Sequence, residues 1–417
     1  MPTAHAIPEE PGLDHSLALL QEGYTYISRR CDRFNSDLFL TRIMLTPVVC
    51  LRGAEAARFV YEGERFTRRG AMPRSVLLLL QDVGSVQTLD GAAHRHRKAM
   101  FLSLMTPDAI PRIGTLLAGH WRDAVRRWEG GGEVVLLDAL AEILTRTACD
   151  WAGLPVPDAD IPALSAELAA MVENAGSLGP SYLVALRLRR RAERRVRHLV
   201  ERLRAAELEA PPGSAALTIA THRDTDGATL PAGIAAVELL NILRPIVAVG
   251  RYITFAALAL HRHPEWRERF AQGDEADLEP FVQEVRRLYP FFPMIGGRAR
   301  QALRWGGHDF APGDWVLLDL HGTNHDPRLW PEPDRFRPER FRGWQGNPYT
   351  LVPQGAGDVA ATHRCPGEWI TIALMKEAVR QLCRMRYTVP PQDLSISLSQ
   401  MPAAPASRFV IGAVRPN

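Results

Sequence analysis

The chain has 417 residues, of which 46% are hydrophobic and 23% are charged, and its formal net charge is +3. This composition is typical of a soluble globular protein with a large core, and the small net charge argues against nucleic acid as a partner. The N-terminus lacks the basic start and apolar run of a signal peptide, and the sequence has no stretch of about 18 uncharged apolar residues that would predict an ordinary membrane span.

The N-terminal third of the chain predicts a small β part followed by helices. Residues 38–53, LFLTRIMLTPVVCLRG, are typical of a β-hairpin that Pro47 interrupts. Beyond the hairpin, apolar residues recur three and four positions apart, which is the spacing of an amphipathic helix. The segments with this spacing are residues 54–63, 94–105, 113–132 and 136–154.

The middle of the chain predicts two long helices. Residues 182–210 form an arginine-rich amphipathic pattern. A nucleic-acid or membrane role is conceivable for it, but the acids mixed among the arginines favour a solvated helix face. Residues 232–264 form a second helical pattern, which is almost entirely apolar.

The C-terminal third alternates between predicted helices, strands and turns. It predicts a helix within residues 281–293, a small hairpin in 302–320, a turn-rich stretch in 321–363, a helix in 366–385 and a strand in 407–414. We therefore expect a mainly α fold with a minor β part at both ends of the chain.

The absence of linkers, repeats and CxxC pairs in the sequence predicts the domain organisation and the cellular compartment. The sequence contains no flexible linker, repeat or low-complexity tract, so we expect one domain over residues 1–417, with a small β-rich part from both terminal segments and a large helical part. The cysteines are scattered and form no CxxC pair, which indicates reduced thiols and a cytoplasmic protein. They are Cys31, Cys50, Cys149, Cys365 and Cys383.

Two neighbouring residues of the long apolar helix are energetically unfavourable in that setting. Pro245 removes a backbone hydrogen bond inside a helix, which destabilises the helix by about 3 kcal/mol. Arg244 brings a guanidinium that cannot lose its charge into an apolar setting. The two penalties side by side indicate a functional position.

Cys365 differs from the other cysteines because it lies between a glycine-bearing loop and the proline that starts a predicted helix. The free N–H groups of a helix N-terminus stabilise a thiolate, and a thiolate is a good ligand for haem iron. A buried structural cysteine would be more common if this residue stood alone. A zinc site with His363 is weaker, because no second ligand pair has zinc spacing.

Further motifs surround this cysteine in a specific order. Glu284 and Arg287 form an ExxR pair on one helix face, and Arg340 in the later PERF segment could join them as a buried triad. ExxR alone would be read as a surface ion pair. The order of ExxR, PERF, cysteine loop and helix is a much stronger signal.

With these motifs the chain resembles the cytochrome P450 haem-thiolate family over nearly its whole length. Two departures stand out: the cysteine loop opens with Pro353-Gln354-Gly355 instead of Phe-x-x-Gly, and Arg244 and Pro245 stand where the family usually has an acid–alcohol pair. Both departures occur together in the bacterial fatty-acid peroxygenases. The segments VELLNILRPIVA, FVQEVRRLYPFFP and HRCPGEW are also similar to that branch.

The resemblance implies haem b ligated by Cys365, hydrogen peroxide as oxidant and long-chain fatty acids as substrates. Arg244 would bind the substrate carboxylate, and that carboxylate would act as the general acid–base that neither Arg244 nor Pro245 can supply. Pro245 would shape the space above the haem. Anchoring at the carboxylate implies hydroxylation at the α or β carbon, with some decarboxylation possible. An internal ion pair of Arg244 with Glu238 is the alternative, but six residues is the wrong spacing for one helix face.

The same resemblance suggests roles for further residues. His94, Lys98 and His363 resemble partners of the haem propionates, and Gln87 resembles an active-site position. Residues that resemble the lining of an acyl channel are Leu80, Met171, Val172 and Phe291, although each alone is more often core.

Two other functions compete with a peroxygenase that needs no redox partner protein. A conventional P450 monooxygenase would take electrons from a ferredoxin or flavoprotein, and the missing acid–alcohol pair argues against it. A non-catalytic haem or fatty-acid binding protein would consume no peroxide.

Overall fold

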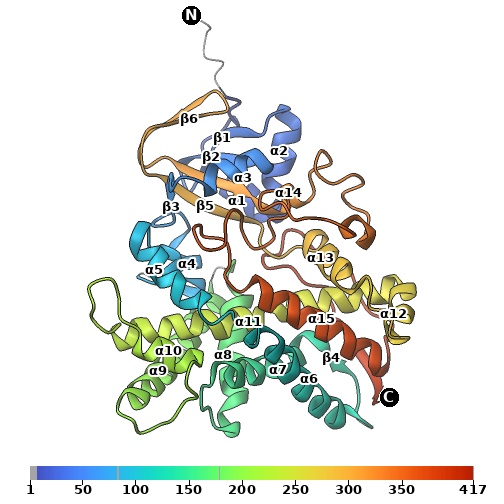
Figure 1. Ribbon diagram of the computed structural model, residues 1–417. Coiled ribbons are helices and arrows are strands. Elements are labelled where there is room, and N and C mark those ends of the chain that lie inside the picture. The colour runs from blue at the N-terminus through green and yellow to red at the C-terminus, as the bar shows by residue number, and fades with distance from the viewer. Residues whose placement is uncertain (1–6, 82–83, 178, 417) are drawn as a thin grey trace, which may run out of the picture.

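The computed structural model describes residues 7–81, 84–177 and 179–416. The strands of the five-stranded sheet lie at one end together with α1, α2 and α3, whereas β4 lies among the helices of the other end (Figure 1). The α-helices are α1 (Ser16–Glu22), α2 (Tyr26–Phe34), α3 (Ala54–Tyr61), α4 (Arg74–Leu80), α5 (Gly91–Leu102), α6 (Ala109–Trp128), α7 (Leu136–Ala152), α8 (Ile161–Glu173), α9 (Pro180–Arg204), α10 (Ala215–Thr221), α11 (Ala232–Arg262), α12 (Pro264–Ala271), α13 (Leu278–Leu288), α14 (Leu320–Asn324) and α15 (Glu368–Arg384). Short 3-10 helices are η1 (Gly23–Thr25), η2 (Val86–Thr88), η3 (Asp158–Asp160) and η4 (Pro338–Phe341).

The strands form a five-stranded sheet in the order β1-β2-β8-β5-β3, a three-stranded sheet β4-β10-β9, and the hairpin β6-β7. In the large sheet β2 and β8 are parallel, and the other pairs are antiparallel. The strands are β1 (Leu38–Ile43), β2 (Thr46–Arg52), β3 (Phe66–Thr67), β4 (Val134–Val135), β5 (Met294–Ala299), β6 (Leu303–Trp305), β7 (His308–Phe310), β8 (Trp315–Asp319), β9 (Arg386–Thr388) and β10 (Val410–Arg415).

The N-terminal hairpin has the form that the sequence predicts. Pro47 pairs with Arg42 near the start of β2, whereas the ladder between β2 and β8 begins only at Val49. The missing N–H of Pro47 therefore removes no bond to β8, which explains how a proline is accepted in a strand with neighbours on both sides.

The predicted hairpin in residues 302–320 is only partly correct. β6 and β7 pair with each other, but β8 leaves the hairpin and lies between β2 and β5. All five residues of β8 are buried. A strand buried on both faces belongs in a sheet interior, which a two-stranded hairpin cannot provide.

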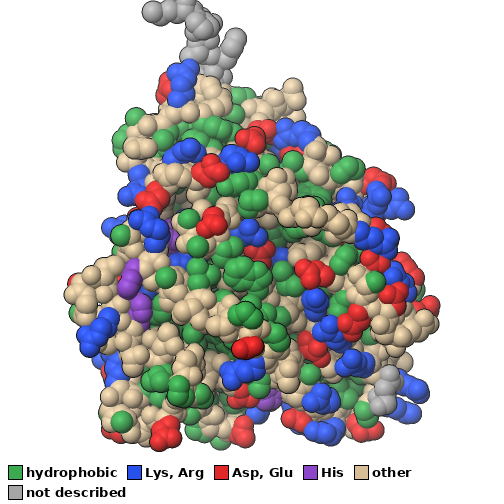
Figure 2. All heavy atoms as spheres, in the orientation of Figure 1, with side chains coloured by type: hydrophobic (Ala, Val, Ile, Leu, Met, Phe, Trp, Pro, Cys, Tyr) green, Lys and Arg blue, Asp and Glu red, His purple; other side chains and the backbone are tan. Residues whose placement is uncertain are grey.

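Several arginines of the arginine-rich helix α9 form ion pairs with acids of the same protein. Arg191 and Arg195 contact Glu167 of α8, and Arg189 and Arg197 pair with acids one turn later on α9. On the face shown in Figure 2, positive and negative side chains are interspersed. The ion pairs of α9 favour a solvated helix face.

Helix α11 is the centre of the helical part. It packs against α7, α8, α9 and α15, and the close approach to α7 occurs at Gly250, where an added Cβ would lie 3.2 Å from the side chain of Leu144. Among the described residues it is the one helix long and apolar enough to span a membrane, but 67% of its most apolar window is buried within the protein. Its apolar surface is thus explained by packing.

Candidate active site

The cysteine loop (residues 353–367) holds Cys365 just before α15. The N–H of Cys365 donates to the carbonyl of Gln354 at 3.1 Å, and the sulfur of the half-buried thiol accepts the N–H of Gly367. Burial raises the pKa of the Cys365 thiol, and the N–H of Gly367 acts in the opposite direction. The sulfur thus has the N–H donor that a thiolate ligand needs.

The side chain of Gln354 lies behind the same sulfur. Its Nε2 is 3.8 Å from Sγ of Cys365 and donates to Thr371 at 3.1 Å, while its Oε1 accepts from Arg286 at 3.0 Å. Arg286 also forms an ion pair with Glu368. Because buried groups hold both ends of its amide, the orientation of Gln354 is defined.

The ExxR pair lies at the base of this loop. Both oxygens of Glu284 accept from Arg287, at 2.7 and 2.8 Å, and neither side chain is exposed. Nε of Arg340 reaches the same carboxylate at 3.2 Å. Arg287 also donates to the carbonyl of Asn324, whose side chain accepts the N–H of Val352 at 2.9 Å. The triad therefore links α13 to the residue directly before the cysteine loop.

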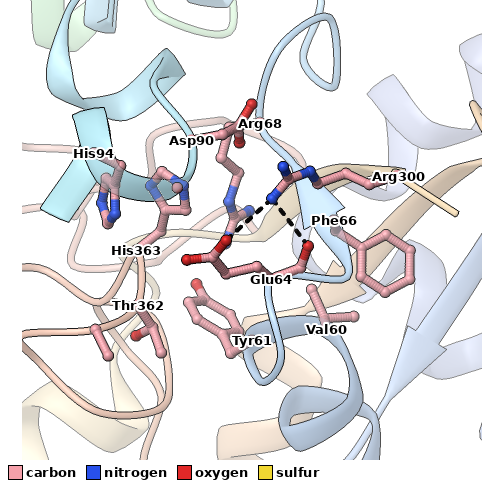
Figure 3. A pocket seen from close by; sticks show the side chains of 12 residues that line it. Val60, Tyr61, Glu64, Phe66, Arg68, Asp90, His94, Arg300, Thr362 and His363 are labelled. Atoms are coloured by element: carbon pink, nitrogen blue, oxygen red, sulfur yellow. Dashed lines mark hydrogen bonds and ion pairs between the residues drawn. The ribbon is translucent and has the colours of Figure 1, made fainter.

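A cluster of basic side chains lies on the other side of the loop (Figure 3). The rings of His94, on α5, and His363, in the loop, have centroids 4.0 Å apart. Lys98 donates to the carbonyls of Thr362 and Arg364. Arg68 lies over the ring of Tyr61 and lines the same pocket as both histidines.

This cluster is largely buried, and the carboxylates of Glu64 and Asp90 line the same pocket. Burial lowers the pKa of His94 to about 4 and that of Lys98 to about 8, and it lowers the pKa of His363 strongly. Within the described part of the chain, no acid forms an ion pair with these groups or with Arg68. A buried set of basic groups beside a cysteine ligand fits the two propionates of haem, so the residues present suit that cofactor.

One face of α11 keeps accessible surface inside an otherwise buried helix. Asn241 and Ala248 are half-buried and Pro245 is exposed, whereas the residues between them are buried. Positions 241, 245 and 248 share a face, since they are four and three residues apart. This face is the one that can border a bound molecule.

Arg244 lies beside this face and is 4% exposed. Its Nη2 donates to the carbonyl of Leu80 and to Oδ1 of Asn241, the latter at 2.7 Å. The alternative ion pair with Glu238 is not formed: Glu238 instead binds Arg97, at 2.8 Å, and Nδ2 of Asn241, at 2.9 Å. Asn241 thus separates the acid from Arg244.

Gln87 belongs to the same set of contacts. Its Oε1 accepts the hydroxyl of Ser85 at 2.7 Å and Nδ2 of Asn241 at 3.1 Å. The structure therefore brings Gln87 and Arg244 to two sides of one asparagine.

The four residues predicted to line an acyl channel differ in accessibility. Leu80, Val172 and Phe291 are half-buried, and Phe291 stacks on Tyr252 with ring centroids 4.1 Å apart. Met171 has no exposed surface and packs in the main core.

Sequence reasoning missed three residues of this site: Arg68, Asn241 and Gln354. Asn241 could have been found, because it stands three residues before Arg244 and therefore on a neighbouring helix position. Arg68 and Gln354 lie in irregular segments, where no periodicity shows which way a side chain points.

Comparisons with known proteins agree with this geometry. A family model described as Cytochrome P450 matches residues 278–393. Among curated proteins, the putative cytochrome P450 120 of Synechocystis is 25% identical over 94% of this chain and 92% of its own length. The match to rhazimal synthase of Alstonia scholaris is 32% identical but spans only 29% of that protein.

Solved structures match nearly the whole chain. Cytochrome P450EX alpha (CYP152N1) with myristic acid is 42% identical, with a TM-score of 0.95, over 99% of this chain and 100% of that one. A variant of cytochrome P450SP alpha (CYP152B1) is 45% identical, with a TM-score of 0.95, over 97% and 100%. A variant of cytochrome P450 OleT in complex with arachidonic acid is 33% identical, with a TM-score of 0.95, over 99% of both chains.

Proposed function

Because the chain belongs to the cytochrome P450 family, we propose that it is a peroxygenase that hydroxylates long-chain fatty acids at the α or β carbon with hydrogen peroxide. The observation that carries the proposal is the buried guanidinium of Arg244 next to Pro245, on the helix that borders the site. The similarity to structures that contain myristic acid and arachidonic acid supports a fatty acid as substrate.

Haem b is the cofactor. Cys365 is its ligand, and the basic cluster of His94, Lys98, His363 and Arg68 binds its propionates. When bound, haem supplies the iron centre that activates peroxide. Residues 1–417 act as one domain, whose helical part carries this cofactor.

Arg244 binds the carboxylate of the fatty acid. Its planar guanidinium suits a carboxylate geometrically, and burial strengthens the charge-assisted hydrogen bonds. Activation of peroxide needs a group that accepts a proton from one oxygen and returns it to the other. Arg244 stays protonated and Pro245 has no side-chain donor, so the bound carboxylate takes that role.

The position of the carboxylate sets the carbon that reacts. With the carboxylate at Arg244, the α and β carbons are the first to reach the space that Pro245 borders, and the rest of the acyl chain extends past Leu80, Val172 and Phe291. Gln87 presents a neutral amide near the carboxylate. A neutral amide donates a hydrogen bond but no full proton, which favours hydroxylation over decarboxylation.

The same reasoning supports turnover without a redox partner protein. α11 carries Arg244 and Pro245 where a conventional monooxygenase has an acid–alcohol pair for dioxygen. We place the protein in the cytoplasm on its dispersed cysteines, all five of which are free thiols.

Mass spectrometry of products tests this function directly. The haem-loaded protein is mixed with myristic acid and hydrogen peroxide, without nicotinamide cofactor or reductase, and the 2- and 3-hydroxy acids are measured. Product only with an electron-transfer partner would indicate a conventional monooxygenase. Binding of myristic acid with no oxidised product would indicate a carrier or sensor.

A further inference from the structure

The side chain of Gln354 ends beside the sulfur of Cys365. Its Nε2 lies 3.8 Å from Sγ, within hydrogen-bonding reach of a sulfur acceptor. The backbone N–H of Gly367, at the start of α15, donates to the same sulfur. A side-chain donor therefore joins a backbone donor at Cys365.

Arg286 determines which end of the Gln354 amide faces the sulfur. An arginine only donates hydrogen bonds, so the amide atom that Nη2 of Arg286 contacts at 3.0 Å has to be the oxygen, Oε1. The NH2 group at the other end of the amide then has to face Cys365 and Thr371. The chemistry of Arg286 thus directs the donor end of Gln354 toward the sulfur.

Thr371 takes one of the two amide hydrogens. The hydroxyl of Thr371 donates to the carbonyl of Gly367 at 3.2 Å, so its oxygen is available to accept from Nε2 of Gln354 at 3.1 Å. An NH2 group carries two hydrogens. The second hydrogen of Gln354 is therefore the one directed to Cys365.

Arg286 is itself held firmly. It is buried, its Nη1 donates to Oε1 of Gln283 at 2.6 Å, and its Nη2 forms the ion pair with Glu368. Glu368 in turn accepts from Nε of Arg364 at 2.7 Å. Rotation of the Gln354 amide would turn its NH2 group against the donors of Arg286, so these contacts keep the amide in one orientation.

We infer that Gln354 is a second hydrogen-bond donor to the thiolate of Cys365 and reduces the electron density that the sulfur gives to haem iron. A hydrogen bond to a metal ligand draws charge away from the metal and is one of the means by which a protein sets the reduction potential of haem. The inference rests on the proposed function in one respect, which is the ligation of haem by Cys365.

Matched variants at two glutamines test this role. Gln354→Met removes the donor and keeps an unbranched side chain of similar length. Gln283→Met is the control, since Gln283 is also a buried glutamine that accepts from Arg286, but within the described part of the chain it has no hydrogen bond to Cys365. The haem-loaded proteins are compared by the ferric–ferrous midpoint potential, by the iron–sulfur stretching frequency in resonance Raman spectra and by haem content.

We expect Gln354→Met to raise the iron–sulfur stretching frequency and to make the midpoint potential more negative. At a fixed applied potential, the ratio of ferrous to ferric haem should fall by about two- to tenfold, which corresponds to the loss of one hydrogen bond. Gln283→Met should keep both values of the parent protein.

A second pair of variants covers the case in which Gln354→Met does not fold. Gln354→Glu keeps an acceptor for Arg286 but has no N–H for the sulfur. It should shift the frequency and the potential in the same directions, beyond any shift in Gln283→Glu, which adds the same charge beside the same arginine.

Two results would overturn the inference. In the first, the Gln354 variants have the potential and the stretching frequency of the parent. In the second, the matched variants at Gln354 and Gln283 shift equally, which would assign the effect to Arg286. Failure of the proposed function looks different: a parent that forms no hydroxylated acid but shows the thiolate-type Soret band would contradict the function, while the comparison of potentials would still decide the role of Gln354.

Discussion

His94 and His363 lie ring against ring, with 4.0 Å between their centroids, although one belongs to α5 and the other to the cysteine loop. Burial lowers the pKa of both imidazoles, so each is held as a neutral hydrogen-bonding group. With Lys98 and Arg68 they form a wall of donors along a pocket that Glu64 and Asp90 also line. We propose that this wall binds a propionate of haem, since its cationic groups can form charge-assisted hydrogen bonds with a carboxylate.

The first prediction concerns Arg68 in this wall. Arg68→Leu should lower haem retention, because a propionate would lose a charge-assisted partner worth about 1.5–3 kcal/mol. The measurement is the rate of haem transfer to an excess of apomyoglobin. Arg69→Leu is the matched control, since Arg69 is the exposed neighbour of buried Arg68. Equal transfer rates in the two variants would remove Arg68 from the haem site.

The second prediction concerns Cys365. Cys365→Ser should abolish the red-shifted Soret band of the reduced carbon monoxide complex, because an alcohol does not replace a thiolate as the donor to iron. Cys383→Ser is the control, since Cys383 is buried in the core at the end of α15. A band that survives in the Cys365 variant would contradict the ligand assignment.

The third prediction concerns Arg244. Arg244→Ala should keep haem but lose nearly all peroxide-driven fatty-acid oxidation, because losing a charged pair from a low-dielectric site costs about 2–5 kcal/mol and the catalytic carboxylate is lost with it. Arg244→Lys should be impaired as well, since an ammonium lacks the planar fork. Product yield by mass spectrometry, normalised to haem content, measures both effects.

Added short carboxylic acids provide a separate test of Arg244. Substrates without a carboxylate should react poorly with the parent protein and better when a short free acid is present, because that acid would occupy Arg244 and carry the proton. The Arg244→Ala variant should show no such enhancement. If non-acid substrates react equally with and without the short acid, Arg244 has only a structural role.

The fourth prediction concerns Asp319, a buried residue at the end of β8. Burial raises the pKa of Asp319 to about 7, so between about pH 4 and 7 the folded state keeps a proton that the unfolded state releases. This group therefore stabilises the fold less as pH rises through that window. Asp319→Asn, which keeps an acceptor for the N–H of Gly322 at 2.6 Å, should gain up to about 2–3 kcal/mol over the parent between pH 5 and pH 8.

Urea unfolding of both proteins at the two pH values measures this difference. Asp14→Asn is the control, since Asp14 is exposed and the pKa of its carboxyl is lowered, first of all by the N–H of Leu45. A stability difference between the Asp319 variant and the parent that does not change with pH would show that Asp319 is ionised in the folded state.

The sequence by itself determined the features that depend on local order along the chain. Helical periodicity located α11, and the incompatibility of Arg244 and Pro245 with an apolar helix marked them without any structure. The succession of Glu284, Arg287, Arg340 and Cys365 identified the family for the same reason, since the order and spacing of motifs can be read directly from the chain.

Only the tertiary structure decided which groups meet across long sequence separations. It placed β8 between β2 and β5, brought Arg68 to the two histidines, and set the side chain of Gln354 between Arg286 and Cys365. It also showed that Asn241, and no direct ion pair, lies between Glu238 and Arg244. These contacts depend on which distant segments pack together, because most buried donors and acceptors need a partner and local sequence does not show where that partner lies.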